Sequence, residues 1–438
     1  MPLLIVLIGI VLLFILIAGF KLNSFISFII VCLFVGIVGG MELQSVIDSI
    51  QTGIGKTLGY LVLILGLGAM LGKLVADSGA AQRITSKLVD KFGVKHIQWA
   101  LVLTGFIVGI PMFYTVGFVI LVPLVFTVAA QTKLPLIYVG LPMLASLSVT
   151  HGFLPPHPAP TAIAVMFGAD IGKTLIYGII IAIPTIIIAG PLFTRTIKNV
   201  NATPLMEFYN PIILKDEEMP SMANSVFSAL LPVILIGFST IALSVLPSDF
   251  ILNDVIGFIG NPIMAMLISV LVAIYTLGLS RGKKMKELMT SVSTAISSIT
   301  MVLLIIAGAG ALKQILTDSG VSDYIGSLLS DSSISPLILA WLIATVLRIC
   351  VGSATVAGLT AAGIILPMVS TTGVSPELMV IAIGAGSLMC SHVNDGGFWM
   401  FKEYFNLSVK DTLKTWTVME TTVGVLGLVG ALILNNFV

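Results

Sequence analysis

Polar side chains interrupt an apolar sequence at four points, and their types suit the binding of a polar solute. Two interruptions are short, at Gly109-Ile110-Pro111 and Gly352-Ser353, and two are longer, at residues 151–158 and 391–397. Hydroxyl, imidazole and amide groups can donate hydrogen bonds to a polyhydroxylated molecule and accept them from it. A helix that restarts at such a point also directs its positive dipole end toward an anionic group. The residues expected to line the site are Tyr114, Thr115, His151, His157, Ser353, Thr355 and Asn394.

Each of these residues also has a purely structural explanation. Serine and threonine in membrane helices often hydrogen-bond to their own helix or to a neighbour. His151 and His157 lie beside three prolines and could cap the carbonyls that the break frees. The sequence alone therefore leaves solute contact and helix capping open at these positions.

Charged and titratable side chains lie at the interruption at residues 391–397 and just before the one at Gly352-Ser353. Asp395 is the only acidic residue at a break, and a carboxylate inside a membrane is costly to keep charged, so Asp395 and His392 are candidate proton-coupling residues. Asp395 could instead cap the helix that follows it. Arg348, just before the second short break, could pair with a substrate carboxylate or brace the chain there.

The composition indicates that apolar helices and lipid surround these residues. Of the 438 residues, 57% are hydrophobic and only 9% are charged, whereas roughly a quarter of the residues in soluble domains are charged. A net charge of +1 gives no reason to expect nucleic acid as a partner. The three cysteines lie in apolar stretches without metal-ligand spacing, so neither a metal nor a cofactor is expected.

Apolar segments of membrane-crossing length recur along the whole chain. Residues 97–131 and 336–372 are broken in the middle and predict two re-entrant hairpins, whereas residues 135–168 and 376–406 have the polar interruptions of discontinuous helices. The pattern predicts an all-α polytopic membrane protein with about 10 transmembrane helices and two re-entrant hairpins. The uninterrupted spans are expected near residues 3–20, 24–40, 58–76, 174–193, 226–247, 257–279, 292–316 and 414–437.

Basic residues indicate which side of the membrane each loop faces. The first basic residue, Lys21, follows the first apolar run, so a retained helix is expected there and not a cleaved signal peptide. If the basic cluster at 281–286 faces the cytoplasm, most other basic loops do so too and most acidic loops face outward. This separation requires that the two hairpins do not cross the membrane, and it predicts that both termini are periplasmic.

The two halves of the chain resemble each other at a constant displacement of 241 positions. Asp77-Ser78-Gly79 recurs as Asp318-Ser319-Gly320, and His151 falls on His392. We expect Asp77 and Asp318 to cap helices through these turns. The charge distribution places them on opposite sides, which predicts two inverted repeats, typical of transporters with a binding site near the membrane midplane. The expected division is N-terminal scaffold helices at 1–57, a first repeat at 58–193, a linker with two scaffold helices at 194–291 and a second repeat at 292–438.

Four motifs together are specific enough to indicate a family, namely Gly68-Ala69-Met70-Leu71-Gly72-Lys73, His151-Gly152-Phe153-Leu154-Pro155-Pro156-His157-Pro158, Gly352-Ser353-Ala354-Thr355-Val356-Ala357 and Ser391-His392-Val393-Asn394-Asp395 followed by Phe398-Trp399. They resemble the gluconate permease family of the ion-transporter superfamily, and the similarity extends along essentially the whole chain. The resemblance implies uptake of D-gluconate or a related sugar acid with protons across the bacterial inner membrane. It also implies a homodimer of scaffold and mobile transport domains that works as an elevator. Related branches carry idonate or D-serine.

Two positions depart from the family pattern. Thr115 stands where the resemblance implies an acidic residue, and a hydroxyl does not titrate in the working range, so the chain could be an uncoupled variant or could couple protons through Asp395 or a histidine. Gly396 stands where relatives commonly have proline, for which we expect only a change in local stiffness.

Two other kinds of protein fit parts of the pattern. A passive channel needs a continuous polar path, whereas the four interruptions are expected to meet at one closed site. A membrane-embedded enzyme could use Ser353 and His392 as a nucleophile pair, but no nucleophile motif or oxyanion-loop pattern accompanies them. The sequence therefore favours a transporter without enzymatic activity.

Overall fold

The computed structural model is helical throughout the residues that it describes, which are 2–197, 200–203, 214–247, 249–320, 334–393 and 395–438, and no β-strand occurs among them. Asn394 and parts of the expected linker, 198–199 and 204–213, lie outside the described residues. The fold class predicted from the sequence, an all-α polytopic membrane protein, is confirmed.

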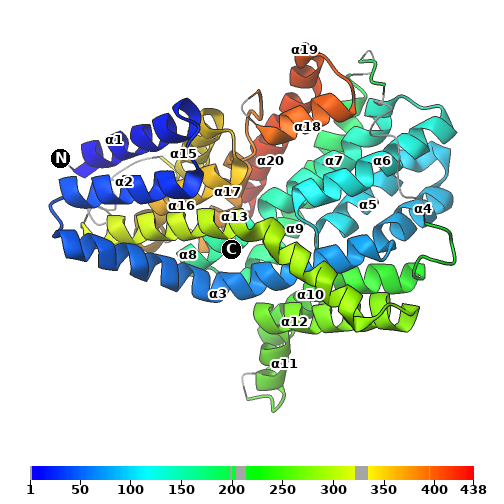
Figure 1. The fold of residues 1–438 in the computed structure, drawn as a ribbon, viewed down its shortest axis with the longest axis horizontal. Helices are drawn as coiled ribbons and strands as arrows, with labels where there is room; N and C mark the ends of the chain where they lie inside the picture. The colour runs from blue at the N-terminus through cyan, green and yellow to red at the C-terminus, as the bar shows by residue number, and fades with distance from the viewer. Residues whose placement is uncertain (1, 198–199, 204–213, 248, 321–333, 394) are drawn as a thin grey trace.

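The helices follow the apolar segments in chain order (Figure 1). Short π-helical turns extend several of them, including η3 (Ile188–Leu192) after α9 and η7 (Leu413–Thr417) before α20. The first half contains α1 (Pro2–Phe14), α2 (Ser24–Val38), α3 (Leu43–Asp77), α4 (Ala80–Phe92), α5 (Ile97–Gly109), α6 (Tyr114–Thr132), α7 (Leu136–Phe153), α8 (Pro158–Phe167) and α9 (Ile171–Ile187). The second half contains α10 (Met222–Val245), α11 (Asn253–Gly260), α12 (Pro262–Ala273), α13 (Met285–Asp318), α15 (Pro336–Val351), α16 (Ala354–Thr371), α17 (Pro376–Gly386), α18 (Gly396–Tyr404), α19 (Val409–Thr412) and α20 (Val418–Leu434).

Among the described residues, eight helical segments are long and apolar enough to cross a membrane. The bent pair Ala80–Phe92 and Val94–Gly109, which turns by 111°, makes a ninth candidate. α2, α15, α16 and α17 contribute shorter apolar helices. The eight segments are Leu43–Asp77, Tyr114–Thr132, Leu136–Phe167, Ile171–Leu192, Met222–Val245, Pro262–Arg281, Met285–Asp318 and Val409–Leu434.

All four interruptions seen in the sequence are breaks between helices. α5 ends at Gly109 and α6 begins at Tyr114, while α15 ends at Val351 and α16 begins at Ala354. Gly352 has a φ of +79°, the left-handed conformation that commonly ends a helix and that glycine adopts without steric cost. The two longer interruptions separate α7 from α8 and α17 from α18.

Two expected domain boundaries fall inside helices. The boundary between residues 57 and 58 lies within α3, and that between 291 and 292 lies within α13. Both helices begin with residues of mixed polarity, such as Asp48 and Lys56 in α3, so hydropathy falls below the level of a membrane span although the backbone stays helical. In both helices the helical backbone therefore begins before the apolar segment.

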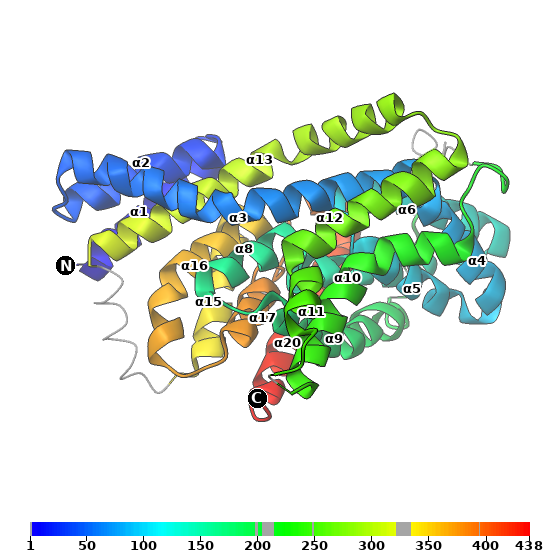
Figure 2. The same cartoon turned by 90° about the horizontal axis from the view of Figure 1, so that it is seen from below.

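α3 and α13 form a long pair that runs through the molecule in opposite directions (Figures 1 and 2). The Ser291 hydroxyl donates to Asp77 Oδ2 over 2.6 Å at one end, and the Ser49 hydroxyl donates to Asp318 Oδ2 over 2.6 Å at the other. The expectation of helix capping is wrong for Asp77, because α4 begins after Gly79 without a side-chain cap; for Asp318 it stays a prediction, since residues 321–333 lie outside the described residues. Each aspartate also accepts a hydrogen bond from a side chain one turn earlier in its own helix.

The broken helices pack beside this pair and interlock the two halves. α8, from the first half, packs against α16 and α17 of the second half, and α7 packs against α5, α6 and α20. In Figure 2, α8 lies beside α16 beneath α3. This interlocking brings the ends of helices from both halves to one place inside the molecule.

Candidate functional site

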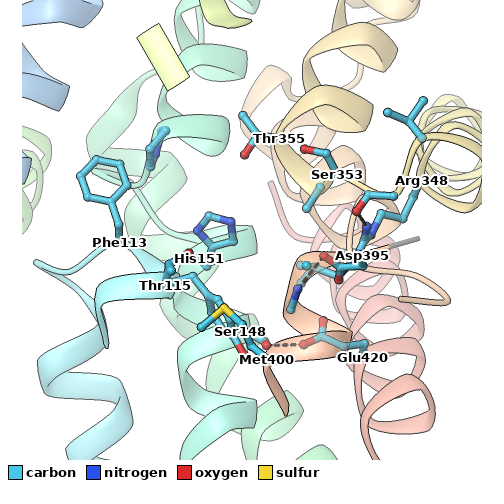
Figure 3. Close-up of a pocket in the computed structure, with 18 of the residues that line it drawn as sticks. Phe113, Thr115, Ser148, His151, Arg348, Ser353, Thr355, Asp395, Met400 and Glu420 are labelled. Atoms are coloured by element: carbon cyan, nitrogen blue, oxygen red, sulfur yellow. Dashed lines mark hydrogen bonds and ion pairs between the residues drawn. The ribbon is translucent and has the colours of Figure 1, made fainter. Parts of the chain in front are cut away.

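A cavity of about 440 Å³ lies where the four breaks meet. Residues 113–115, Pro158, 352–355 and 395–397, one stretch from each break, contribute to its walls, and we call it the central cavity (Figure 3). Its polar lining consists of Tyr114, Thr115, Ser148, His151, Arg348, Ser353, Thr355, Asp395, Trp416 and Glu420.

Four helices begin at the central cavity, namely α6, α8, α16 and α18. The Ser353 hydroxyl accepts from the Val356 amide at the start of α16, over 3.4 Å. Asp395 is the N-cap of α18, and its Oδ1 accepts from the Gly397 amide over 2.9 Å. Because the N-terminus of a helix carries partial positive charge, this arrangement favours an anion in the cavity.

Arg348 joins two of the breaks. Its guanidinium pairs with Asp395 Oδ2 over 2.5 Å and also donates to the Gly352 carbonyl at the tip between α15 and α16. The Arg348 side chain is 3% exposed and that of Asp395 is 17% exposed. Of the two roles left open by the sequence, the structure shows Arg348 bracing the tip, while its position in the lining also leaves it beside any bound anion.

The Asp395 carboxylate has a full set of hydrogen-bond partners. Besides Arg348 and the Gly397 amide, it accepts from the Ser391 hydroxyl, which in turn accepts from Trp416 Nε1 over 2.7 Å. A guanidinium and two further donors hold this carboxylate in one position. These contacts favour the capping and bracing role of Asp395.

A second carboxyl group in the lining belongs to Glu420, near the start of α20. The side chain is 2% exposed, and Glu420 Oε1 accepts from the hydroxyl of Ser148 on α7. Figure 3 shows this contact on the same side of the cavity as Met400, below Asp395. The two residues are 272 positions apart, so the hydrogen bond links the two halves of the chain.

The two histidines of the first long break have different surroundings. The His151 ring lines the cavity, and its Nδ1 has no hydrogen-bond partner among the described residues. His157 is buried beneath it with the ring centroids 5.4 Å apart, and its Nε2 lies 2.8 Å from the Gly109 carbonyl oxygen. His157 thus satisfies a carbonyl freed at the end of α5, which was its structural alternative, and His151 remains available to a solute.

Tyr114 and Thr115 begin α6 at the cavity wall. The Tyr114 ring centroid lies 5.8 Å from that of His151 and 6.0 Å from that of Trp416. The Tyr114 hydroxyl is buried without a hydrogen-bond partner in the described part of the chain.

The structure brings together most of the residues predicted from the sequence. Neither His157 nor His392 belongs to the lining, and Asn394 lies outside the described residues. The residues placed at the cavity are Tyr114, Thr115, His151, Ser353, Thr355 and Asp395.

Three polar residues of the lining were missed. Glu420 and Trp416 lie in the expected span 414–437, and an acidic residue inside an apolar span is a signal that could have identified Glu420. Ser148 lies one helical turn before His151 and therefore on the same face of α7. Within the described residues, no group of three His, Cys, Asp or Glu side chains is placed to hold a metal ion.

Comparison with known proteins gives matches over the full length. The family described as GntP family permease matches residues 1–438. The high-affinity gluconate transporter of Escherichia coli strain K12 is 56% identical over 435 residues, which cover 99% of each chain. The Gnt-II system L-idonate transporter of the same strain is 52% identical, and the gluconate permease of Bacillus subtilis strain 168 is 51% identical, each with 99% of both chains covered.

Solved structures share the fold at much lower sequence identity. The YdaH transporter of Alcanivorax borkumensis has a TM-score of 0.65 at 16% identity, over 94% of this chain and 98% of that one. MtrF of Neisseria gonorrhoeae, described as illuminating a class of antimetabolite efflux pumps, has a TM-score of 0.67 at 14% identity, over 93% and 94% of the two chains. The matched family and the relatives are transporters, which removes the alternative of a Ser353–His392 enzyme.

Proposed function

Because the chain belongs to the GntP permease family, we propose that it is a secondary transporter that imports D-gluconate or a closely related sugar acid together with protons. The observation that carries this proposal is the convergence of four helix N-termini, Arg348 and a set of hydroxyl and imidazole groups on one buried cavity. Its volume of about 440 Å³ lies within the range of small-molecule sites.

The cavity suits a molecule with a charged end and a hydroxylated chain. The charged lining residues, Arg348, Asp395 and Glu420, all come from the second half of the sequence, whereas the first half contributes uncharged groups such as Thr115 and His151. The substrate carboxylate binds near Arg348 and the start of α16, where Ser353 and Thr355 lie. The hydroxyl groups extend toward Thr115 and His151, which face this wall in Figure 3.

The protein consists of two inverted repeats, and transport proceeds by an elevator-type alternating-access mechanism. The antiparallel α3–α13 pair supports this arrangement, because Asp77 and Asp318, displaced by 241 positions, lie at its opposite ends. The start of α7 and that of α17, at Leu136 and Pro376, follow nearly the same displacement. The transporter is a homodimer in the bacterial inner membrane with both termini periplasmic.

Proton coupling is the least constrained part of the proposal. The sequence predicts Asp395 and His392 as coupling residues, and these assignments stay predictions, with the Asp395 contacts favouring a bracing role. Thr115 lines the cavity and cannot titrate there. An uncoupled transporter, or one that prefers idonate or D-serine, is the alternative, and an L-idonate transporter is among the relatives.

Uptake of radiolabelled D-gluconate into proteoliposomes at several external pH values tests this proposal. We expect saturable uptake that accumulates substrate against its gradient, is abolished by a protonophore, and is inhibited by idonate more strongly than by glucuronate or D-serine. Preferential inhibition by D-serine would change the substrate class. Unsaturable uptake that never exceeds equilibration would indicate a channel and contradict the transport mechanism.

A further inference from the structure

Glu420 is a buried carboxyl group in the central cavity that the sequence motifs do not include. It lies in α20, in the apolar segment Val409–Leu434, and its side chain is 2% exposed. Burying a carboxyl group inside a membrane protein is costly, and such residues usually belong to an ion or proton pathway. We propose that Glu420, held by Ser148, takes up one proton with each substrate molecule and releases it on the other side.

The hydrogen-bond partners of Glu420 differ from those of Asp395, and this difference favours Glu420 as the residue that carries the proton. Asp395 accepts from a guanidinium, a hydroxyl and a backbone amide. Glu420 accepts from one neutral hydroxyl, that of Ser148, and no ion pair joins it to a basic side chain in the described part of the chain. A single neutral donor is compatible with both the charged and the neutral carboxyl group, because the second oxygen remains free to carry a proton.

The charged and titratable groups around Glu420 all belong to the cavity. α7 contributes His151, α15 contributes Arg348, the break before α18 contributes Asp395, and α6 contributes Tyr114. The described residues of α9, α17, η3 and η7, which also pack against α20, add no titratable side chain to the lining; Lys414 of η7 lies outside it. Arg348 forms its ion pair with Asp395, and no ion pair joins it to Glu420 among the described residues.

The coupling follows from Coulomb repulsion, and it rests on the proposed function. A substrate carboxylate and an ionised Glu420 in one cavity of about 440 Å³ repel each other. Binding of the anion therefore favours Glu420 with a proton bonded to its free oxygen, and by linkage the proton favours binding of the anion. After reorientation the O–H bond breaks, the proton leaves to cytoplasmic water and the substrate dissociates. One anion and one proton enter per cycle, so the cargo is neutral.

Glu420→Gln is the direct test, because the amide oxygen can still accept from Ser148 while the group no longer titrates. We expect accumulation driven by an imposed pH gradient to be lost, and any exchange of labelled for unlabelled D-gluconate that remains at equal pH to be independent of pH. Wild-type accumulation should rise about tenfold per pH unit for a one-to-one stoichiometry. Glu403→Gln is the control, since the Glu403 side chain lies outside the cavity lining and is 51% exposed.

The possible results distinguish the role of Glu420 from the proposed transport of a sugar acid. Gradient-driven accumulation by Glu420→Gln equal to that of wild type would overturn the role of Glu420 and leave sugar-acid transport intact. If Glu420→Gln also loses exchange, Glu420→Asp decides: accumulation with the pH response of wild type supports the proposal, and its loss overturns it. A wild-type protein that exchanges no sugar acid would overturn the proposed function and this inference together.

Discussion

At the scale of single residues, Arg348 connects the two parts of the cavity wall that come from the second half. Its guanidinium contacts both the Gly352 carbonyl and the Asp395 carboxylate, so the tip between α15 and α16 is tied to the start of α18. Removing one member of a buried ion pair leaves the other charge uncompensated, which is more costly than removing both. Arg348 therefore fixes the geometry of the site whether or not it contacts the substrate.

The first prediction is a mutant cycle on this pair. Arg348→Met should destabilise the protein by about 3–5 kcal/mol, because the half-buried Asp395 carboxyl group loses its partner. Asp395→Asn in the same background should recover part of that loss. Thermal unfolding of the purified variants in detergent measures both effects, and a double variant less stable than Arg348→Met would show that the ion pair does not brace the tip.

The second prediction concerns Thr115, whose side chain faces the cavity from the first half. Thr115→Glu adds a titratable carboxyl group to the wall opposite Arg348, so binding of an anionic substrate should depend more steeply on pH than in wild type. Counterflow of labelled D-gluconate between pH 5 and pH 8 measures this dependence. Thr115→Gln is the matched control, and equal pH profiles for the two variants would mean that position 115 does not approach the substrate.

At the scale of elements, the close contact of α3 and α13 makes the long helix pair a rigid unit. At Gly53 a Cβ atom would lie 2.4 Å from the Gly310 carbonyl oxygen and 2.8 Å from the Ala311 Cα, so no side chain fits there. Gly310 faces Gly53 in the same way, and its own Cβ would lie 2.8 Å from the Gly53 carbonyl oxygen. Small residues at both positions let the backbones approach, as is common between membrane helices.

The third prediction compares two glycines of one helix. Gly53→Ala should destabilise the protein by about 1–3 kcal/mol, because the backbone of α13 has to move away. Gly55→Ala, two residues on, meets nothing within 4 Å, and alanine is favoured over glycine in a helix by about 1 kcal/mol. Thermal unfolding should therefore shift in opposite directions for the two variants, and a larger loss for Gly55→Ala would contradict the contact described here.

The positions of most elements and breaks follow from local sequence. Hydropathy and the Gly and Pro positions predict the breaks at 109–113 and 352–353. Proline lacks the backbone N–H that continues a helix, and glycine readily adopts the left-handed conformation that ends one. α3 and α13 begin before the apolar spans expected at residues 58–76 and 292–316. Hydropathy identifies only the apolar part of a helix, whereas polar residues also form helices. The number of membrane spans predicted from hydropathy likewise depends on the residues at which each apolar segment is taken to begin and end.

At the scale of the whole molecule, the site depends on contacts between segments far apart in the chain. The sequence predicts that the four breaks meet, and they do, because the interrupted helices of the two halves pack against each other. Pairings such as Ser148 with Glu420 or His157 with the Gly109 carbonyl do not follow from local patterns. They require the relative position of α7, α20 and α5, which only the packed structure provides.

The central claim is that the cavity between the four breaks holds the sugar acid, and equilibrium binding of labelled D-gluconate to the purified protein tests it most directly. The variants are Ser353→Leu, which fills the cavity at the start of α16, and Ser244→Leu, which places the same side chain in a separate pocket beside α10 and α12. Thermal unfolding first establishes that both variants are folded. We then predict that Ser353→Leu weakens binding at least about tenfold, while Ser244→Leu binds D-gluconate as wild type does. Undiminished binding by Ser353→Leu would contradict the account.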